Sequence, residues 1–444
     1  MQLVNIMMIP KRKLIFFVLY ALPLISFSQE NSPYSRYGIG NLVPSGNILN
    51  RGMGGISAGF SDAATINFLN PATYSNLVLT TLDIGAQVDS RTIKSTASAK
   101  KYTANNAVIS YLNIGFPLLN SNKKAAANKV AWGVNFGLKP VSKINYKIEK
   151  NSRISNIDSL TSLYEGSGGV NEGFIGTGIK IKDFSVGLNF GYLFGNKNYS
   201  TRLGFINDTV NYLKSNSSTQ TNFGGIFFNA GVQYAVKLTG GFLRLGAYGK
   251  MQKKYNASRD VLRETFTYNS ATGGTDRLDS VYTSNGQKGF IQLPSTYGLG
   301  FTFDDQKHWL FGLDFEISNW SNYRFYGLKD SVKNNSTIKA GFQYSPAKEA
   351  SRKYWDFVKY RAGFYFGPDY ISVGKRLSQF NITAGASLPL KLKRAFYETQ
   401  YSIMNVGLEY GNRGNSTNSI RESILRINVG FSLSDVWFVR RKYQ

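Results

Sequence analysis

Apolar residues recur at every second position over long stretches of this chain. Between Phe184 and Phe194 the even positions carry large apolar side chains, while serine, glycine and asparagine fill most odd positions. Residues 226–238 repeat this arrangement. A period of two places the apolar side chains on one face of an extended strand. Repeated along the chain without helical segments, the pattern is typical of a transmembrane antiparallel β-barrel with a greasy outer face.

The same alternation predicts about fourteen strands, an even number as expected for a single-chain bacterial barrel. We place them at 77–90, 105–116, 129–148, 171–182, 183–203, 222–238, 241–257, 287–305, 307–325, 335–346, 357–370, 376–390, 394–410 and 419–433. A soluble β-sandwich also alternates, but its strands are usually only about 5–6 residues long.

The connections between these strands predict an orientation. Barrels of this class alternate short periplasmic turns with long extracellular loops. The three longest connections, 149–170, 204–221 and 258–286, are all odd-numbered along the chain, and even-numbered ones such as Lys182-Asp183 are tight. Two even connections, 117–128 and 347–356, are exceptions. The pattern places both chain ends in the periplasm.

Residues 1–28 read as a secretory signal peptide. Lys11, Arg12 and Lys13 precede the apolar run 14–25, and Ser26-Phe27-Ser28 forms a small-x-small cleavage site. The run is too short for a transmembrane helix, which needs about 20 residues. We expect cleavage after Ser28 and a basic periplasmic tail at 434–444. The chain contains no cysteine, which excludes a lipid-anchored cysteine and any disulfide.

The residue inventory argues against an enzyme. His308 is the single histidine and cysteine is absent, so transition-metal sites and histidine-based nucleophile systems have no support. Asp314 and Glu316 share a strand face, where an ordinary polar lumen explains them better than acid–base chemistry. We predict no catalytic residue, no metal and no cofactor.

The chain is strongly basic, with a formal net charge of +26. One interpretation of this charge is general solubility. The alternative is attraction to phosphorylated lipopolysaccharide or to acidic partners. The cations are dispersed along an exported chain, so nucleic acid is not an expected partner.

Residues 29–76 do not read as barrel wall. They contain Pro33, Pro44 and Pro71 and a cluster of glycines between 52 and 59. We expect a compact, irregular segment that precedes the barrel and plugs its lumen.

Two motifs suggest a family. The first is Arg51-Gly-Met-Gly-Gly-Ile-Ser-Ala-Gly-Phe-Ser-Asp62, followed by Asn70-Pro71-Ala72. The second runs from Leu293-Pro294-Ser295 through Asp314 to Trp320-Ser321. Together they resemble the N-terminal hatch and a strand hairpin of the FadL-type outer-membrane transporters of hydrophobic compounds and long-chain fatty acids, which include PorV-like relatives.

The resemblance implies an all-β, fourteen-stranded barrel at 77–433 with a hatch at 29–76 inside the lumen, in the outer membrane of a Gram-negative cell. Relatives pass fatty acids or aromatic hydrocarbons through a hydrophobic pocket and sideways through the wall, and PorV-like relatives serve protein secretion. The residues carried over as candidate hatch or ligand positions are Gly52, Gly54, Gly55, Asn70, Pro71, Ala72 and Trp320.

Three functions follow as hypotheses. The first is passage of a hydrophobic, fatty-acid-like molecule through hatch rearrangement and a lateral opening. The second is a non-transporting scaffold or secretion partner that docks a periplasmic or secretion-system protein. The third is a general porin. In each case the expected surroundings are outer-membrane lipid and lipopolysaccharide.

Overall fold

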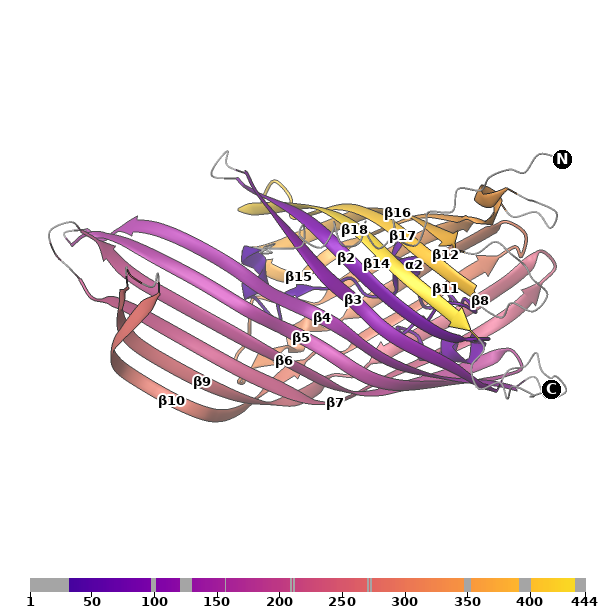
Figure 1. Cartoon of the computed structure of the whole chain (residues 1–444), viewed down its shortest axis with the longest axis horizontal. Helices are drawn as coiled ribbons and strands as arrows, with labels where there is room; N and C mark the ends of the chain where they lie inside the picture. Colours follow the sequence, from indigo (N-terminus) through magenta and orange to yellow (C-terminus); the bar gives the residue numbers. More distant parts are fainter. Residues whose placement is uncertain are drawn as a thin grey trace.

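The protein is a single antiparallel β-barrel with an irregular N-terminal segment inside it (Figure 1). The computed structural model describes residues 32–96, 101–119, 130–155, 157–207, 210, 212–269, 271, 274–346, 353–390 and 401–435. The expected signal peptide and most of the basic tail lie outside these ranges.

The strands of the described residues form one sheet that closes where β18 pairs with β2. They are β1 (Asn41–Leu42), β2 (Thr80–Ser95), β3 (Lys101–Leu119), β4 (Val130–Arg153), β5 (Ser159–Ile181), β6 (Phe184–Ile206), β7 (Lys214–Leu238), β8 (Gly241–Lys250), β9 (Lys253–Tyr268), β10 (Thr275–Leu293), β11 (Thr296–Asp304), β12 (Trp309–Ser318), β13 (Arg324–Phe325), β14 (Asn335–Tyr344), β15 (Lys359–Val373), β16 (Lys375–Pro389), β17 (Tyr401–Arg413) and β18 (Ile420–Asp435).

Among the described residues, the barrel wall consists of fourteen strands, which confirms the predicted fold class. β8 and β9 together make one wall strand, because both pair with β7. β10 and β11 make the next one, interrupted at Pro294 and Ser295. The two-residue strands β1 and β13 are additions to the wall.

The period-two pattern produces the expected faces. On β12, Trp309, Phe311 and Leu313 are exposed on the outside, whereas Asp314 is fully buried on the inside. On β6, Val186, Leu188 and Phe190 are likewise exposed, whereas Asn189 is buried. This part of the barrel therefore presents hydrocarbon to lipid and polar groups to the lumen, as transmembrane barrels require.

The predicted long extracellular loops are wrong. β4 continues to Arg153 and β5 begins at Ser159, so the connection is 154–158 and not 149–170. The connections 204–221 and 258–286 likewise shrink to 207–213 and 269–274. The extracellular connection 319–334 is longer than these three. It begins earlier than predicted, because β12 ends at Ser318 and not at residue 325.

The physical reason is that pairing continues after the lipid ends. On β6 the outward residues change from Phe194 to Asn196, Asn198 and Ser200, while the ladder to β5 and β7 stays regular. Water contacts the outer face there, so the apolar signal disappears although the strand does not. We call the projecting parts of β4, β5, β6, β7, β9 and β10 the extracellular wall (143–153, 159–169, 196–206, 214–223, 257–268 and 275–287).

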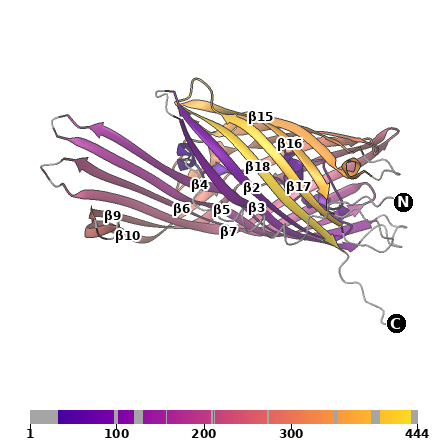
Figure 2. The same cartoon turned by 45° about the horizontal axis from the view of Figure 1, so that its top comes forward.

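The extracellular wall projects well beyond the rest of the barrel. In Figures 1 and 2 these six strands extend past the ends of β2 and β3. Within the described residues, β10 pairs on its second side with β13 only at Ile291 and Gln292. The extracellular wall is therefore joined to the shorter strands only near its base.

Residues 32–76, here called the hatch segment, lie inside the barrel. They form the 3-10 helix η2 (Pro33–Arg36), β1, the short helix α2 (Ile48–Arg51) and the 3-10 helix η3 (Pro71–Asn76). Asn47 and Asn70 cap α2 and η3 by accepting backbone N–H groups, and Pro71 starts η3. Most of their side chains are buried against the wall. No helix in the described ranges is both long and apolar enough to cross a membrane.

Candidate functional site: a lumen cavity behind a gap in the wall

The wall is discontinuous between β3 and β4. These strands pair from Leu119↔Trp132 to Leu112↔Leu138, and no further pair joins their described residues beyond that point. Beyond this pair, residues 101–111 of β3 pair only with β2, and residues 139–153 of β4 pair with β5. The two strands therefore diverge, which leaves backbone groups of β4 without a partner from β3.

The hatch segment takes the missing place beside β4. Asn41 and Leu42 of β1 pair with Lys143 and Ser142, and the N–H of Val43 donates to the carbonyl oxygen of Val141 at 3.0 Å. The N–H of Ser32 donates to the carbonyl oxygen of Asn145 at 3.3 Å. A short stretch of hatch thus completes the sheet where the wall strands separate.

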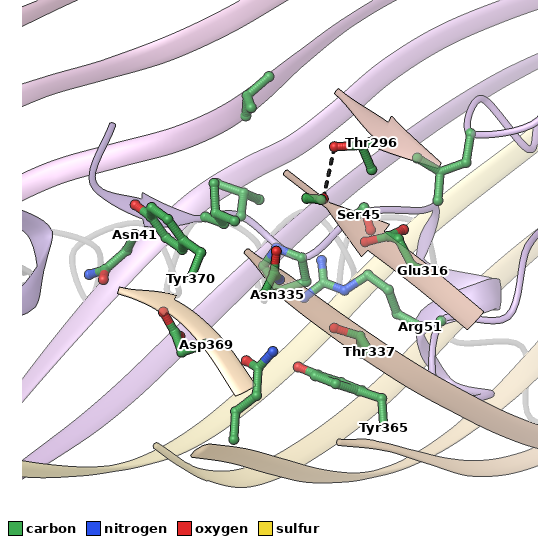
Figure 3. A pocket seen from close by; sticks show the side chains of 18 of the residues that line it. Asn41, Ser45, Arg51, Thr296, Glu316, Asn335, Thr337, Tyr365, Asp369 and Tyr370 are labelled. Carbon is green, nitrogen blue, oxygen red and sulfur yellow. Dashed lines mark hydrogen bonds between the residues drawn. The ribbon is translucent and has the colours of Figure 1, made fainter. Parts of the chain in front are cut away.

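A cavity of about 330 Å³ lies in the lumen beside β1 (Figure 3). One part of its lining is apolar and includes Leu42, Val43, Val141, Leu293 and Trp320. The other part is charged and polar, with Arg51, Lys339, Glu316, Tyr365, Glu409 and Arg426. A cavity with two such parts matches a molecule that has an apolar body and a polar end.

Arg51 reaches into this cavity from the end of α2 (Figure 3). Its side chain is 2% exposed, and Nη1 donates to Gln87 Oε1 at 2.8 Å. Nη2 lies 3.9 Å from Glu409 Oε2, which is an ion pair but too long for a hydrogen bond. Nε and Nη2 have no hydrogen-bond partner among the described residues. Burial lowers the pKa of this guanidinium, and the nearby Arg426 lowers it further.

Buried ion pairs surround the cavity on the β15–β18 side. Arg426 Nε lies 2.6 Å from Asp89 and its Nη1 contacts Glu409, while Arg413 Nε lies 2.8 Å from Asp369. Each charge is matched by a neighbour, as a low-dielectric interior requires. Removing one partner would leave an uncompensated charge, so this network fixes the strands around the hatch segment.

The hatch segment is also fixed through its backbone. Asp314 Oδ2 accepts the N–H groups of Ser57 and Ala58 at 2.6 and 2.8 Å. Thr383 Oγ1 accepts the N–H of Gly54 at 2.8 Å. Asp314 therefore holds the hatch segment, which agrees with its predicted place in a polar lumen.

The glycines of the first motif lie against the wall. Gly54 has a φ of +66°, and a Cβ there would lie 2.5 Å from the carbonyl oxygen of Ala340, so only glycine fits. Gly52 approaches the backbone of Gly385, and Gly55 has a φ of +81°. Gly54 and Gly55 also line the cavity, whereas Gly52 does not.

Asn70, Pro71 and Ala72 lie away from the cavity. The side chain of Asn70 donates to the carbonyl oxygens of Ala58 and Val232, which ties the hatch segment to β7. A Cβ at Gly187 would lie 2.3 Å from the carbonyl carbon of Pro71, so this turn packs directly on the wall backbone. Ala72 is fully buried. Their arrangement suits a structural role, and a ligand role for them stays a prediction.

Trp320 lies above the cavity in the extracellular connection 319–334. Its ring centroid is 4.2 Å from that of Tyr370, and its side chain is part of the cavity lining. The same connection holds the hatch segment, because Asp330 Oδ2 accepts the N–H of Gly38 at 2.8 Å and Tyr323 donates to the carbonyl oxygen of Gly38 at 3.0 Å.

Sequence reasoning missed the chemistry of Arg51 and the role of β1. Arg51 opens the glycine motif, and a lone cation within an otherwise apolar, glycine-rich stretch is the available signal. Leu42 and Val43 carry no such signal, because their place depends on where β3 and β4 separate.

Solved structures share this fold at low sequence identity. The toluene transporter TodX of Pseudomonas putida aligns with a TM-score of 0.55 at 13% identity, over 89% of this chain and 100% of that one. The Ralstonia pickettii toluene transporter TbuX gives 0.51 at 14% identity, over 88% and 99%. A Pseudomonas aeruginosa FadL homologue gives 0.54 at 12% identity, over 89% and 99%. These matches confirm the FadL-type fold.

Comparison with curated proteins gives no match. One family model, BamG, matches residues 8–444 and thus covers nearly the whole sequence. The barrel, its internal segment and this match together show that the chain belongs to the BamG family.

Proposed function

We propose that this outer-membrane barrel binds a small hydrophobic molecule with a polar end in its lumen and exchanges it sideways between β3 and β4. The observation that carries the proposal is the position of β1. It lies beside the cavity and pairs with β4 where the wall strands diverge, so withdrawal of residues 41–43 would open a lateral route.

The cavity lining supports a fatty-acid-like ligand over a neutral hydrocarbon. The buried Arg51 guanidinium lines the cavity, and a carboxylate is the acceptor that a guanidinium pairs with best. Leu42, Val43 and Leu293 would contact the apolar chain. A general porin has less support, because residues 32–76 occupy the lumen through which water would pass.

A disulfide between β1 and β4 tests the lateral route. Leu42 and Ser142 are paired across the two strands, and the chain has no native cysteine to interfere. In L42C/S142C, oxidation should stop exchange of radiolabelled decanoate between the protein and liposomes, and reduction should restore it.

The matched control is A362C/A384C, which joins β15 to β16 without touching the hatch segment. It should exchange decanoate equally in both redox states. Unchanged exchange by the oxidised L42C/S142C protein would show that β1 is not the gate.

The second candidate function is docking of a partner protein. The observation that favours it is the extracellular wall, which is longer than a membrane crossing requires. A protein that only moved small molecules across the membrane would have little need of it.

Shortening the β6–β7 hairpin at the Ser200↔Ser218 pair tests docking while keeping the lipid-facing part of both strands. A stoichiometric partner should co-purify with the native chain in mild detergent and be lost from the shortened one. Purification of the native chain with bound lipid alone would count against docking.

A further inference from the structure

The inner face of the extracellular wall is built differently from its outer face. Cross-strand pairs define both faces, because directly opposed residues share a side of the sheet. One inner row runs Ile148, Tyr164, Thr201, Ser217, Arg263 and Tyr282. The next row runs Tyr146, Gly166, Tyr199, Thr219, Val261 and Ser284, and the one below that runs Ile144, Gly168, Lys197, Thr221, Arg259 and Gln287. Small hydroxyl residues of β7 thus form the centre, with tyrosines of β5 and β6 on one side and arginines of β9 on the other.

The outer face pairs its cations with carboxylates. Glu165 lies 3.3 Å from Lys147 Nζ and 3.7 Å from Arg202 Nη1. Glu264 lies 3.5 Å from Arg277 Nε. Another cation of this face, Lys214, lies 5.5 Å from the ring centre of Tyr268, so carboxylates match part of the positive charge here.

The inner face instead stacks its cations on tyrosine rings. Arg259 lies 4.3 Å from the ring centre of Tyr326, and Arg263 lies 5.6 Å from that of Tyr282. Arg36, which the hatch segment adds to this side, lies 5.5 Å from the ring centre of Tyr164.

These three guanidiniums lack an acidic partner. Within the described residues, no carboxylate forms an ion pair with Arg36, Arg259 or Arg263. Asp279, at the end of an inner row beside Thr265, instead accepts the N–H of Ser280. Arg259 Nε and Nη2 donate to Gln287 Oε1 in the same row, at 3.0 and 2.5 Å. Ring stacking and this neutral partner hold the guanidinium in place without neutralising its charge.

We propose that the inner face of the extracellular wall binds an acidic segment of a partner protein. Arginine and tyrosine are the residues enriched in the cores of protein interfaces, and three unmatched cations on one face complement carboxylates. The hydroxyl groups of Thr201, Ser217 and Thr219 between them can donate to the same carboxylates.

The position of this face favours a protein over lipopolysaccharide. Its residues continue the rows that line the lumen below, such as Tyr255 and Ala257, so they lie above the barrel mouth. Membrane phosphates surround the barrel on its outer side, where the carboxylate-paired face lies. The proposal deepens the docking function above, rests on it, and is independent of the lateral route.

Binding of a fluorescein-labelled decaglutamate peptide to the purified full chain in detergent tests the proposal. We compare R259Q/R263Q on the inner face with K147Q/R202Q on the outer face. Each variant removes two positive charges. The inner-face variant should bind the peptide about tenfold more weakly, and the outer-face variant within about twofold of the native chain. Both variants must keep the heat-modifiable migration of a folded barrel.

Equal loss in both variants would show that net charge alone attracts the peptide and would overturn the proposal. So would native-level binding by R259Q/R263Q. Vesicles of phosphorylated lipopolysaccharide serve as the second probe. If they bind through Arg259 and Arg263 while decaglutamate does not bind the native chain, the partner is a membrane surface and the assignment to a protein is wrong. Failure of these experiments leaves the co-purification test of docking unaffected.

Discussion

The wall has a long half around β4–β7 and a short half around β12 and β14, and the strands named here differ in length by more than a factor of two. β4, β5, β6 and β7 have 24, 23, 23 and 25 residues, whereas β12 and β14 have 10 each. A tilted strand crosses the hydrocarbon layer in about 9–11 residues. The short half therefore shows what the membrane requires, and the additional length of the other half serves the space outside it.

Both halves hold the hatch segment through side chains and through close glycine contacts. The short half uses side chains, with Asp314 on β12 and Thr383 on β16 accepting backbone N–H groups. The long half uses side chains too, since Gln233 on β7 donates to the carbonyl oxygen of Ala58 at 2.8 Å, and Gly178 on β5 and Gly187 on β6 lie directly against Pro71. Side chains specify the register of the hatch segment, and glycines allow its close approach.

The largest effect should come from removing the side-chain hold of the short half. Asp314→Ala would leave the N–H groups of Ser57 and Ala58 buried without an acceptor, at about 1–3 kcal/mol each. We expect the free energy of unfolding in liposomes to fall by about 2–6 kcal/mol in total. A loss under about 1 kcal/mol would show that Asp314 does not hold the hatch segment.

The boundary between membrane and extracellular wall can be located on β6. Phe190→Arg places a charge against lipid and should destabilise the barrel by about 2–4 kcal/mol. Ser200→Arg, on the same face farther along the strand, should change stability by less than about 0.5 kcal/mol. Guanidinium unfolding of both variants in liposomes measures the contrast, and equal losses would place Ser200 in the lipid.

A smaller effect on stability should come from the ion pair between the short half and the hatch segment, and it should depend on pH. Lys359 Nζ lies 3.7 Å from Asp62. Although burial opposes ionisation of Asp62, Lys359 and the N–H of Ala64 hold its pKa below the ordinary 3.8. The carboxylate therefore stabilises the fold above pH 3.8, and this contribution disappears as pH falls through the lower folded-state pKa.

Asp62→Asn should remove this pH dependence. Because Lys359 is 39% exposed, solvent screening limits the loss at pH 7 to about 1 kcal/mol or less. Unfolding curves of the native chain and the variant at pH 7 and pH 3 would measure it. Parallel pH profiles would rule Asp62 out as the titrating group.

The smallest effect should come from the outer face of the long half. Glu165→Gln breaks two solvent-exposed ion pairs, to Lys147 and Arg202, and should cost about 0.2–0.5 kcal/mol. High salt should abolish even this difference, because exposed pairs are screened. A salt-independent loss above about 1 kcal/mol would indicate that this face is covered.

The alternation of apolar residues by itself determined the fold class, the number of wall strands and the outward face of strands such as β6, β12 and β18. It could do so because lipid imposes a strict chemical difference between the two faces of every strand. The glycine motif at 51–62 and the turn at 70–72 likewise pointed to a segment outside the wall. Their buried, close-packed positions require small residues that remain visible in the sequence.

Only the tertiary structure decided where the wall opens, what lines the cavity and how far the strands continue. β3 and β4 diverge near the place where β1 pairs with β4, and no side-chain pattern records that pairing. The cavity gathers Arg51, Val141, Leu293 and Glu409 from distant parts of the chain. The extracellular wall escaped prediction because water contacts both of its faces, so hydrogen bonding between backbones continues where the apolar signal has ended.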